Sequence, residues 1–385
     1  MRPGANAGVW ALCAAASYGC AGCHRGRPGA KGAPPSEAGL VSAPSATAAG
    51  SPRGGMIWIP AGAFRAGTPV DRVPRIAEEE LPGTEIALGG YYIDVLAYPN
   101  EAGAIPATSV SRDDAARLCE SRAKRLCSEL EWERACKGPE GTTYEYGDAY
   151  REGVCGTGVT AEQSATRPSG ERQACKSAFG VMGMHGGPWE WTDAAWGRGT
   201  TRDLGVLRGG NAVAGELVGR CANALARHPS SKSPTMGLRC CAGPKNDAIV
   251  DLPLSSGPAL ERSMKTAELT APLAKSFIDT DGPLAFAHAW TWRPVANEQL
   301  VLASGCTRPP LRCRLIVARL ATEAPETGMP PRTLLASIDT GHEAAEVAEV
   351  GDARHLRLKG VDEKSPFLRD FAYAYGRVDL GDIKR

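Results

Sequence analysis

The sequence lacks several features that mark common functional classes. Its 44 Lys and Arg residues are balanced by 43 Asp and Glu residues, and no long basic run appears. This balance argues against a nucleic-acid partner, because phosphate recognition needs clustered positive charge. No segment beyond the first 23 residues reaches transmembrane length without charges. No Ser-His-Asp constellation and no phosphate-binding glycine loop is visible, so the common hydrolase and nucleotide-binding classes are not indicated.

Cysteine, in contrast, is abundant, with 13 residues. Three lie in the first 23 residues, eight lie between positions 119 and 241, and the last two are Cys306 and Cys313. An even number in each folded region predicts a disulfide framework and an oxidising compartment. Cys306 and Cys313 could close a short hairpin-like loop. A zinc site is not indicated, because the folded part has no pair of CxxC knuckles at zinc-like spacing.

The N-terminus predicts export. Residues 9–22 are mostly apolar and small but too short to span a bilayer comfortably, and they are followed by Cys20-Ala21-Gly22-Cys23. The small residues before Cys23 resemble a bacterial lipoprotein processing box, with Cys20 as the competing site. We therefore expect a signal peptide over residues 1–23, lipid attachment at Cys23, and a membrane-anchored or periplasmic or extracellular protein. Residues 24–54, rich in Gly, Pro, Ala and Ser, predict a disordered tether.

Two folded regions follow, one over residues 55–243 and one over 273–385, with a linker over 244–272. In the first region, Ser111 and Asp114 form a capping-box pattern ahead of one helix, and Ser128 and Glu131 repeat it ahead of a second. Residues 138–207 are rich in turn formers and predict long ordered loops. The second region alternates short strand patterns with turns and predicts a small β-rich domain of unknown function. The fold class expected overall is α+β.

An ordered set of short strings in the first region resembles the formylglycine-generating enzyme, or sulfatase-modifying factor, family. Residues 124–133, KRLCSELEWE, resemble the family string KRLPTEAEWE, and residues 180–192, GVMGMHGGPWEWT, resemble GLYDMxGNVWEWT. The other matching segments, in chain order, are 56–67, 106–115, 144–148 (YEYGD), 207–210 (LRGG) and 237–240 (GLRC). The resemblance covers about residues 55–243 and implies a loop-rich, C-type lectin-like α+β fold.

The resemblance also implies part of the disulfide pattern. Two family disulfides correspond here to Cys119–Cys240 and Cys136–Cys221. The other four cysteines of this region depart from the family pattern. For them we prefer the pairs Cys127–Cys241 and Cys155–Cys175.

The catalytic chemistry of the family is not matched by the residues present. The family oxidises a substrate cysteine with oxygen on copper(I) held by two cysteines, which would fall between positions 211 and 220, where this chain has NAVAGELVGR. Glu216 stands where the second thiolate would be, and a carboxylate is a hard ligand that binds copper(I) poorly. A family chemistry that uses non-haem iron needs several histidines, and only His185 and His228 lie in this region. Copper and iron are therefore both disfavoured.

A calcium site is a further family feature, for which Glu190 and the carbonyls of Gly186 and Pro188 would be the ligands. The competing interpretation, which we favour, makes Glu190 a buried hydrogen-bond acceptor. We expect an exported, non-catalytic binding or structural protein whose partner is an unknown protein or glycan. The alternatives are a formylglycine-generating oxidase acting on protein cysteine and a carbohydrate-binding lectin-like module. No cofactor is expected, with calcium as the open possibility.

Overall fold

The structure is a computed structural model that describes residues 53–70, 72, 74–158, 167–198, 203–210, 215–250, 252, 257–274, 278–279, 282–307, 312–320, 332–342, 344–359, 368–374 and 376–384. All of them lie in the compact unit Ala46–Arg385. The expected signal peptide, with Cys20 and Cys23, lies outside the described residues, as does nearly all of the tether. In the described part, no helix has the length and apolar character needed to cross a bilayer.

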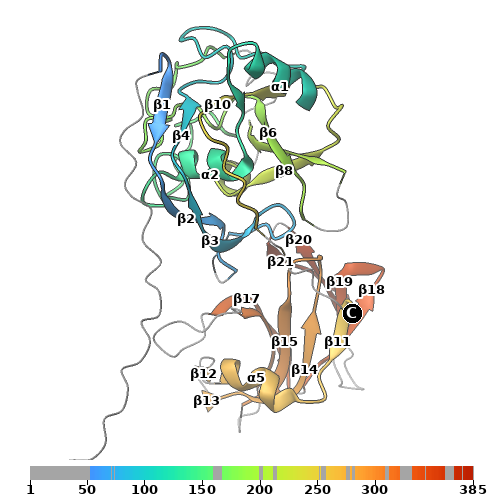
Figure 1. The fold of residues 1–385 in the computed structure, drawn as a ribbon. Coiled ribbons are helices and arrows are strands. Elements are labelled where there is room, and N and C mark those ends of the chain that lie inside the picture. The colour runs from blue at the N-terminus through green and yellow to red at the C-terminus, as the bar shows by residue number, and fades with distance from the viewer. Residues whose placement is uncertain are drawn as a thin grey trace, which may run out of the picture. The chain divides into compact units, whose positions relative to one another are not determined.

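The first folded region is built on two four-stranded sheets and a hairpin (Figure 1). One sheet has the order β1 (Met56–Ile59), β4 (Tyr91–Asp94), β10 (Cys240–Ala242), β5 (Arg125–Leu126). The other has the order β8 (Ala224–Arg227), β7 (Gly205–Gly209), β6 (Trp189–Ala195), β9 (Met236–Leu238). The hairpin pairs β2 (Gly62–Gly67) with β3 (Pro82–Leu88). The described residues between 138 and 188 form no helix or strand, in line with the loops expected there. The expectation extended to residue 207, however, and the structure instead forms β6 and the first part of β7 between 189 and 207.

Both predicted helices are present, and both begin where the sequence predicts. Helix α1 (Arg112–Glu120) is capped by Ser111, whose side chain accepts from the Asp114 backbone while Asp114 accepts from the Ser111 backbone. Helix α2 (Glu129–Lys137) has the same reciprocal capping box between Ser128 and Glu131. Each box satisfies two backbone donors that the first helical turn would otherwise leave unpaired. The capping boxes thus confirm both helix starts.

Five disulfides join the described cysteines. They are Cys119–Cys240, Cys127–Cys241, Cys136–Cys221, Cys155–Cys175 and Cys306–Cys313, the same five pairs that the sequence analysis puts forward. Four of them hold the first region, and two attach both α1 and the segment before α2 to β10. Disulfides in this number are typical of proteins that fold outside the cytoplasm. The framework therefore indicates an extracytoplasmic protein.

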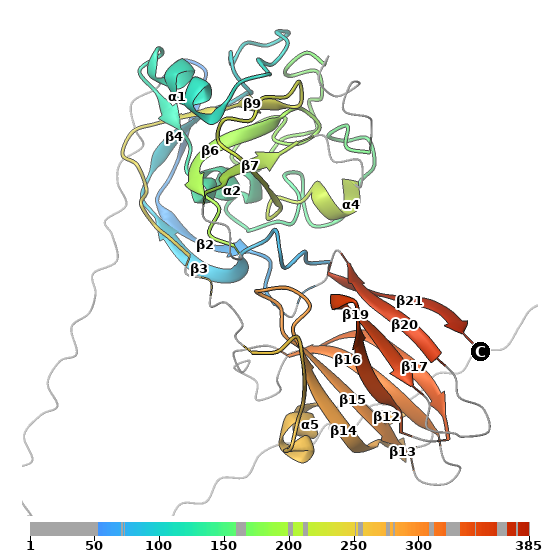
Figure 2. The same ribbon diagram turned by 90° about the vertical axis from the view of Figure 1, so that its right-hand side faces the viewer.

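The second folded region is a two-layer β arrangement. Its five-stranded sheet has the order β11 (Leu260–Arg262), β14 (Ala285–Trp292), β15 (Leu300–Cys306), β16 (Cys313–Leu320), β17 (Arg332–Gly341). The four-stranded sheet has the order β18 (Glu346–Val350), β19 (Asp352–Lys359), β20 (Leu368–Ala374), β21 (Arg377–Lys384). A short pair, β12 (Ile278–Asp279) and β13 (Gly282–Pro283), completes the region. Figure 2 shows β19, β20 and β21 in a layer separate from β14, β15 and β16.

The two faces of β15 explain why this region has two cores. Leu300 and Leu302 share a core with the second sheet, in which Trp292 meets Phe371 edge-on with ring centroids 5.6 Å apart. Val301 and Ala303, on the opposite face, pack with Leu273 of α5 (Thr266–Ala274). Successive side chains of a strand point to opposite faces, so a strand covered on both faces is apolar throughout.

The structure differs from the expectation for residues 244–272. Strand β11 and most of α5 lie in that stretch, and β11 pairs antiparallel with β14. Leu269 packs on the core beneath α5. Strand β11 has only three residues and is only partly buried. It is therefore too short to show the alternation of apolar and polar residues by which a strand is predicted from sequence. The second folded region therefore begins near residue 260 in the structure.

Candidate functional site

The segment where the resembling oxidases hold copper carries no thiol in its described part. Helix α4 (Gly215–Val218) presents Glu216 to solvent, while residues 211–214 lie outside the described residues. The backbone carbonyl of Glu216 accepts a 2.8 Å hydrogen bond from the Tyr144 hydroxyl. The next cysteine along the chain, Cys221, is bonded to Cys136. This segment offers a soft metal ion one exposed carboxylate and no sulfur.

A group of tyrosines packs beside α4. The ring of Tyr144 stacks on that of Tyr146 at 5.5 Å, and Tyr150 lies 5.6 Å from Tyr144. Burial raises the pKa of Tyr144 from 10.0 to about 12. The phenol is therefore a neutral hydrogen-bond donor at physiological pH and holds the α4 backbone in place.

The expected calcium ligand Glu190 lies in a buried polar cluster. Its carboxylate accepts hydrogen bonds from the Trp132 indole at 2.6 Å and from Nε and Nη2 of Arg239, each at 2.9 Å. Arg239 also donates to four backbone carbonyls, those of Asp94, Val95, Met182 and Gly183. A guanidinium already supplies the positive charge that this carboxylate needs, so Ca²⁺ would have to compete with it. The calcium assignment to Glu190, Gly186 and Pro188 stays a prediction.

The arginine of the LRGG string has a comparable structural role. Arg208 is fully buried, and one of its nitrogens, Nη1, lies within 3.2 Å of the carbonyls of Cys221, Ala222 and Asn223. Its other terminal nitrogen, Nη2, donates to Glu133 at 2.9 Å. Burial opposes ionisation of Glu133, but Lys137 and Arg208 outweigh it and leave the pKa of that carboxyl lowered. The two most distinctive arginines of the matching strings therefore stabilise the core.

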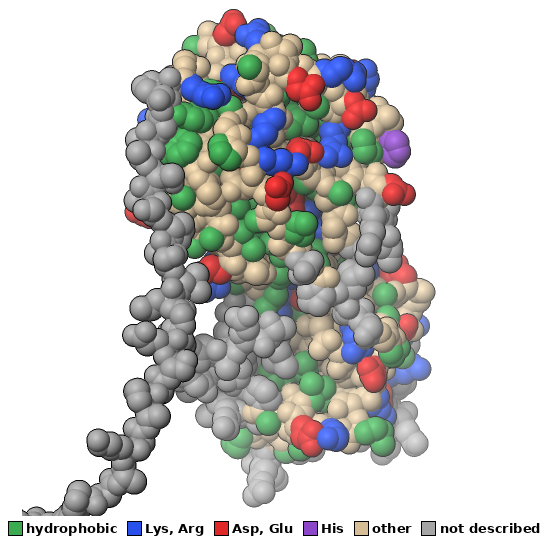
Figure 3. Space-filling model, viewed as in Figure 1, with side chains coloured by type: hydrophobic (Ala, Val, Ile, Leu, Met, Phe, Trp, Pro, Cys, Tyr) green, Lys and Arg blue, Asp and Glu red, His purple; other side chains and the backbone are tan. Residues whose placement is uncertain are grey.

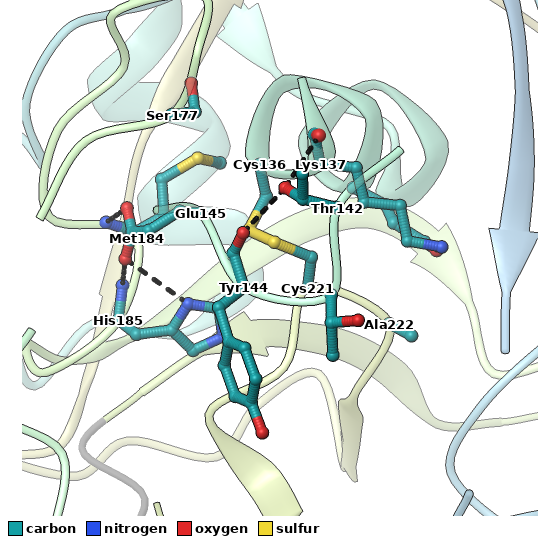
Figure 4. The surroundings of a disulfide bond; sticks show 12 residues. Cys136, Lys137, Thr142, Tyr144, Glu145, Ser177, Met184, His185, Cys221 and Ala222 are labelled. Carbon is teal, nitrogen blue, oxygen red and sulfur yellow. Dashed lines mark hydrogen bonds and ion pairs between the residues drawn. A yellow bond between two sulfur atoms is a disulfide. The ribbon is translucent and has the colours of Figure 1, made fainter. Parts of the chain in front are cut away.

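A third buried carboxylate, Glu145, has a different environment (Figure 4). It belongs to the YEYGD string and accepts backbone hydrogen bonds from Met184 and His185, each at 3.0 Å. Its Oε1 atom lies 2.9 Å from Sγ of Cys155 and 2.9 Å from Sγ of Cys175. The Nδ1 atom of His185 is 3.5 Å from the same oxygen. Three side chains with metal-binding atoms, those of Cys155, Cys175 and His185, thus lie near one carboxylate.

A cavity adjoins this cluster. Its lining includes Cys155, Cys175 and His185, the neighbouring backbone of Gly186 and Pro188, and the exposed side chain of Glu171. The lining thus extends from buried residues of the cluster to an exposed residue of the neighbouring loop. The two carbonyl residues named for calcium therefore border this cavity, and the carboxylate named for it is bound to Arg239.

Glu145 was not among the functional candidates predicted from the sequence, and His185 was considered there only as one of the two histidines of this region. His228, the other histidine of this region, is exposed and bonds to Ser230. In the described ranges, the cluster of metal-binding atoms comprises Glu145, Cys155 and Cys175, and His228 takes no part in it. The position of Glu145 inside a recognisable string was the available signal, but no spacing rule links it to cysteines 10 and 30 positions away.

On the face drawn in Figure 3, basic and acidic side chains are interspersed, and hydrophobic side chains are scattered among them. This agrees with the balanced composition of the chain.

Residues 97–243 match the family described as "Sulfatase-modifying factor enzyme 1-like domain". The chain is 28% identical over 152 residues to "Inactive C-alpha-formylglycine-generating enzyme 2" of Bos taurus, a match that covers 36% of this chain and 50% of that protein. The protein of the same name from Mus musculus is 28% identical over 160 residues, with 37% and 52% covered. The chain spans about half the length of the curated relatives it matches.

Two solved structures are also similar to part of the chain. The structure of PvdO from Pseudomonas aeruginosa has a TM-score of 0.38 at 21% identity and covers 48% of this chain and 93% of that one. The Treponema denticola variable protein 1 has a TM-score of 0.37 at 14% identity and covers 49% and 95%.

Proposed function

Since this chain belongs, through residues 97–243, to the sulfatase-modifying factor enzyme 1-like family, we propose that it is a non-catalytic member that acts outside the cytoplasm as a binding or structural protein. The first folded region would present its long loops to a protein or glycan partner. The curated relatives quoted above carry the word "inactive" in their names, and this supports the same interpretation for the present chain.

One observation carries the proposal: in the described residues every cysteine is in a disulfide. Oxygen-dependent oxidation of a peptide cysteine needs a redox centre, which in the resembling enzymes is two thiolates on copper(I). Soft ions select sulfur ligands, and Glu216 cannot replace them. Two arginines of the family strings, Arg208 and Arg239, are paired with Glu133 and Glu190 in the core.

The test uses the exported full chain with its disulfides intact. It is incubated with oxygen and a cysteine-containing sulfatase-type peptide, with and without copper(I), and the peptide mass is followed. No conversion to formylglycine is expected in either condition, and copper(I) should not bind stoichiometrically. Turnover that is abolished by Glu216→Ala would contradict the proposal and show that α4 contributes to an oxidase site. The binding role is tested separately by capture of glycans and proteins on the immobilised mature chain.

A further inference from the structure

The cluster around Glu145 takes no part in the function proposed above. The sulfur atoms of Cys155 and Cys175 are joined in a disulfide, so neither carries a hydrogen. The two 2.9 Å contacts with Oε1 of Glu145 therefore cannot be hydrogen bonds while the disulfide is closed. One carboxylate oxygen therefore lies in close contact with both sulfur atoms of the disulfide.

His185 adds an independent observation. Its side chain is 1% exposed, yet neither ring nitrogen has a hydrogen-bond partner. A buried imidazole normally satisfies both nitrogens, since an unpaired buried polar group costs free energy. The Nδ1 atom faces the same carboxylate oxygen, as Figure 4 shows. A ring nitrogen of His185 that has no hydrogen-bond partner therefore faces the Glu145 carboxylate.

The geometry points to a zinc(II) site that forms when the Cys155–Cys175 disulfide is reduced. Two thiolates, the Glu145 carboxylate and the His185 imidazole are then four ligands of the types that zinc binds tetrahedrally. Bonds of about 2.0–2.3 Å place neighbouring ligand atoms roughly 3.3–3.8 Å apart. The carboxylate oxygen is already 2.9 Å from each sulfur and 3.5 Å from Nδ1. Two changes are required: the two sulfur atoms must separate, and the His185 ring must move closer to them, because its nitrogens lie outside the compact group formed by Glu145, Cys155 and Cys175.

The local backbone holds this arrangement in register. Gly186 has a φ of +80°, and a Cβ atom at that position would lie 1.5 Å from the carbonyl oxygen of Cys155. Only glycine permits so close an approach of the two segments. The backbone N–H of His185 also donates to Glu145, which fixes the carboxylate beside the imidazole. The ligands are therefore positioned by packing that does not depend on the disulfide alone.

Conversion of the disulfide into the zinc site requires a reductant, and a dithiol can supply the electrons and protons. The dithiol delivers two electrons and two protons, the Sγ–Sγ bond breaks, two thiols form, and the dithiol becomes a cyclic disulfide. Zinc(II) then displaces the two thiol protons as the thiolates bind. A disulfide oxidant reverses both steps: it takes two electrons from the two thiolates and two protons from water, leaves as two thiols, and the Sγ–Sγ bond re-forms as the zinc ion is released. In an oxidising compartment the Cys155–Cys175 disulfide would link these two segments. In a reducing compartment a zinc ion bound by the four residues would link them instead.

The experiment begins with graded dithiol treatment of the full chain, followed by anaerobic removal of the reductant. Mass mapping of alkylated peptides identifies the disulfides that have opened, and circular dichroism reports whether the chain stays folded. Zinc is then titrated against a chromophoric chelator, and cobalt(II) reports the ligand set by its absorption spectrum. We expect one zinc ion per folded chain after reduction and none before it.

Matched variants separate this site from other sulfur atoms. Cys155→Ser/Cys175→Ser should abolish zinc uptake, whereas Cys306→Ser/Cys313→Ser should leave it unchanged. Glu145→Gln and His185→Ala should each weaken zinc binding by about tenfold or more, because losing even a supporting group of a metal site costs 10- to 100-fold. His228→Ala is the control for His185. Failure of the folded, reduced chain to take up zinc would overturn the proposal, and so would opening of Cys155–Cys175 only on global unfolding.

Discussion

Arg239 and Glu190 form a fully buried ion pair, with Nε of the arginine 2.9 Å from Oε2 of the glutamate. The two residues come from β6 and from the short link between β9 and β10, 49 positions apart in the chain. The pair connects the parallel strands β6 and β9 to the loop carbonyls that Arg239 also contacts. It is therefore a central support of the first folded region.

Removing one partner of this pair should be strongly destabilising. Arg239→Met would leave the Glu190 carboxylate buried without its cation, at a cost of about 3–5 kcal/mol in the free energy of unfolding. Arg117→Ala, which breaks an exposed pair with Asp114, should cost less than about 1 kcal/mol and serves as the control. Denaturant unfolding without reductant measures both. If the two substitutions lowered the free energy of unfolding equally, the Arg239–Glu190 pair would contribute little to stability.

Alkaline pH should destabilise the chain through Tyr144. Its pKa is raised in the folded state from 10.0 to about 12, first of all by burial. Between these two pH values the unfolded chain has lost a proton that the folded chain still holds, so stability falls as pH rises through the window. Tyr144→Phe should remove this component, visible as a missing tyrosinate absorbance step near pH 12.

Glu216→Ala is the matched control for Tyr144→Phe. It keeps the backbone carbonyl that accepts from Tyr144 and removes only an exposed side chain. Its effect on unfolding should stay within about 0.5 kcal/mol, as for most surface positions. A larger loss would assign the Glu216 carboxylate a role beyond the surface of α4.

We expect no free cysteine between residues 119 and 241 of the exported protein. The structure pairs all eight of them. Alkylation under denaturing, non-reducing conditions, followed by peptide mass mapping, should therefore leave them unlabelled. Stoichiometric labelling of Cys240 or Cys241 would instead show that this region has thiols able to bind copper(I).

The N-terminal prediction is tested by fractionation. Cys23→Ser should release the protein from the membrane fraction or leave it unprocessed, because Cys23 follows the small-residue box of the apolar segment. Cys20→Ser should leave membrane attachment unchanged. A wild-type protein that is fully soluble and begins beyond residue 23 would refute lipid attachment.

Local features were predictable from the sequence because they depend on residues close together in the chain. The reciprocal bonds of Ser111 with Asp114 and of Ser128 with Glu131 span three positions, so each helix start is encoded where it occurs. The even grouping of cysteines indicated a disulfide framework for the same local reason. The absence of cysteine between positions 211 and 220 likewise needed no structure to be seen.

The buried carboxylates were decided by the tertiary structure. Glu190 and Glu145 are both glutamates in recognisable strings, and nothing in the sequence distinguishes their roles. The fold places Arg239 against the first and two cysteines with a histidine against the second. Burial removes water as a partner, so the group that the chain places nearest determines whether a carboxylate is a structural acceptor or a candidate metal ligand. That placement depends on contacts between residues up to 58 positions apart, which no local pattern records.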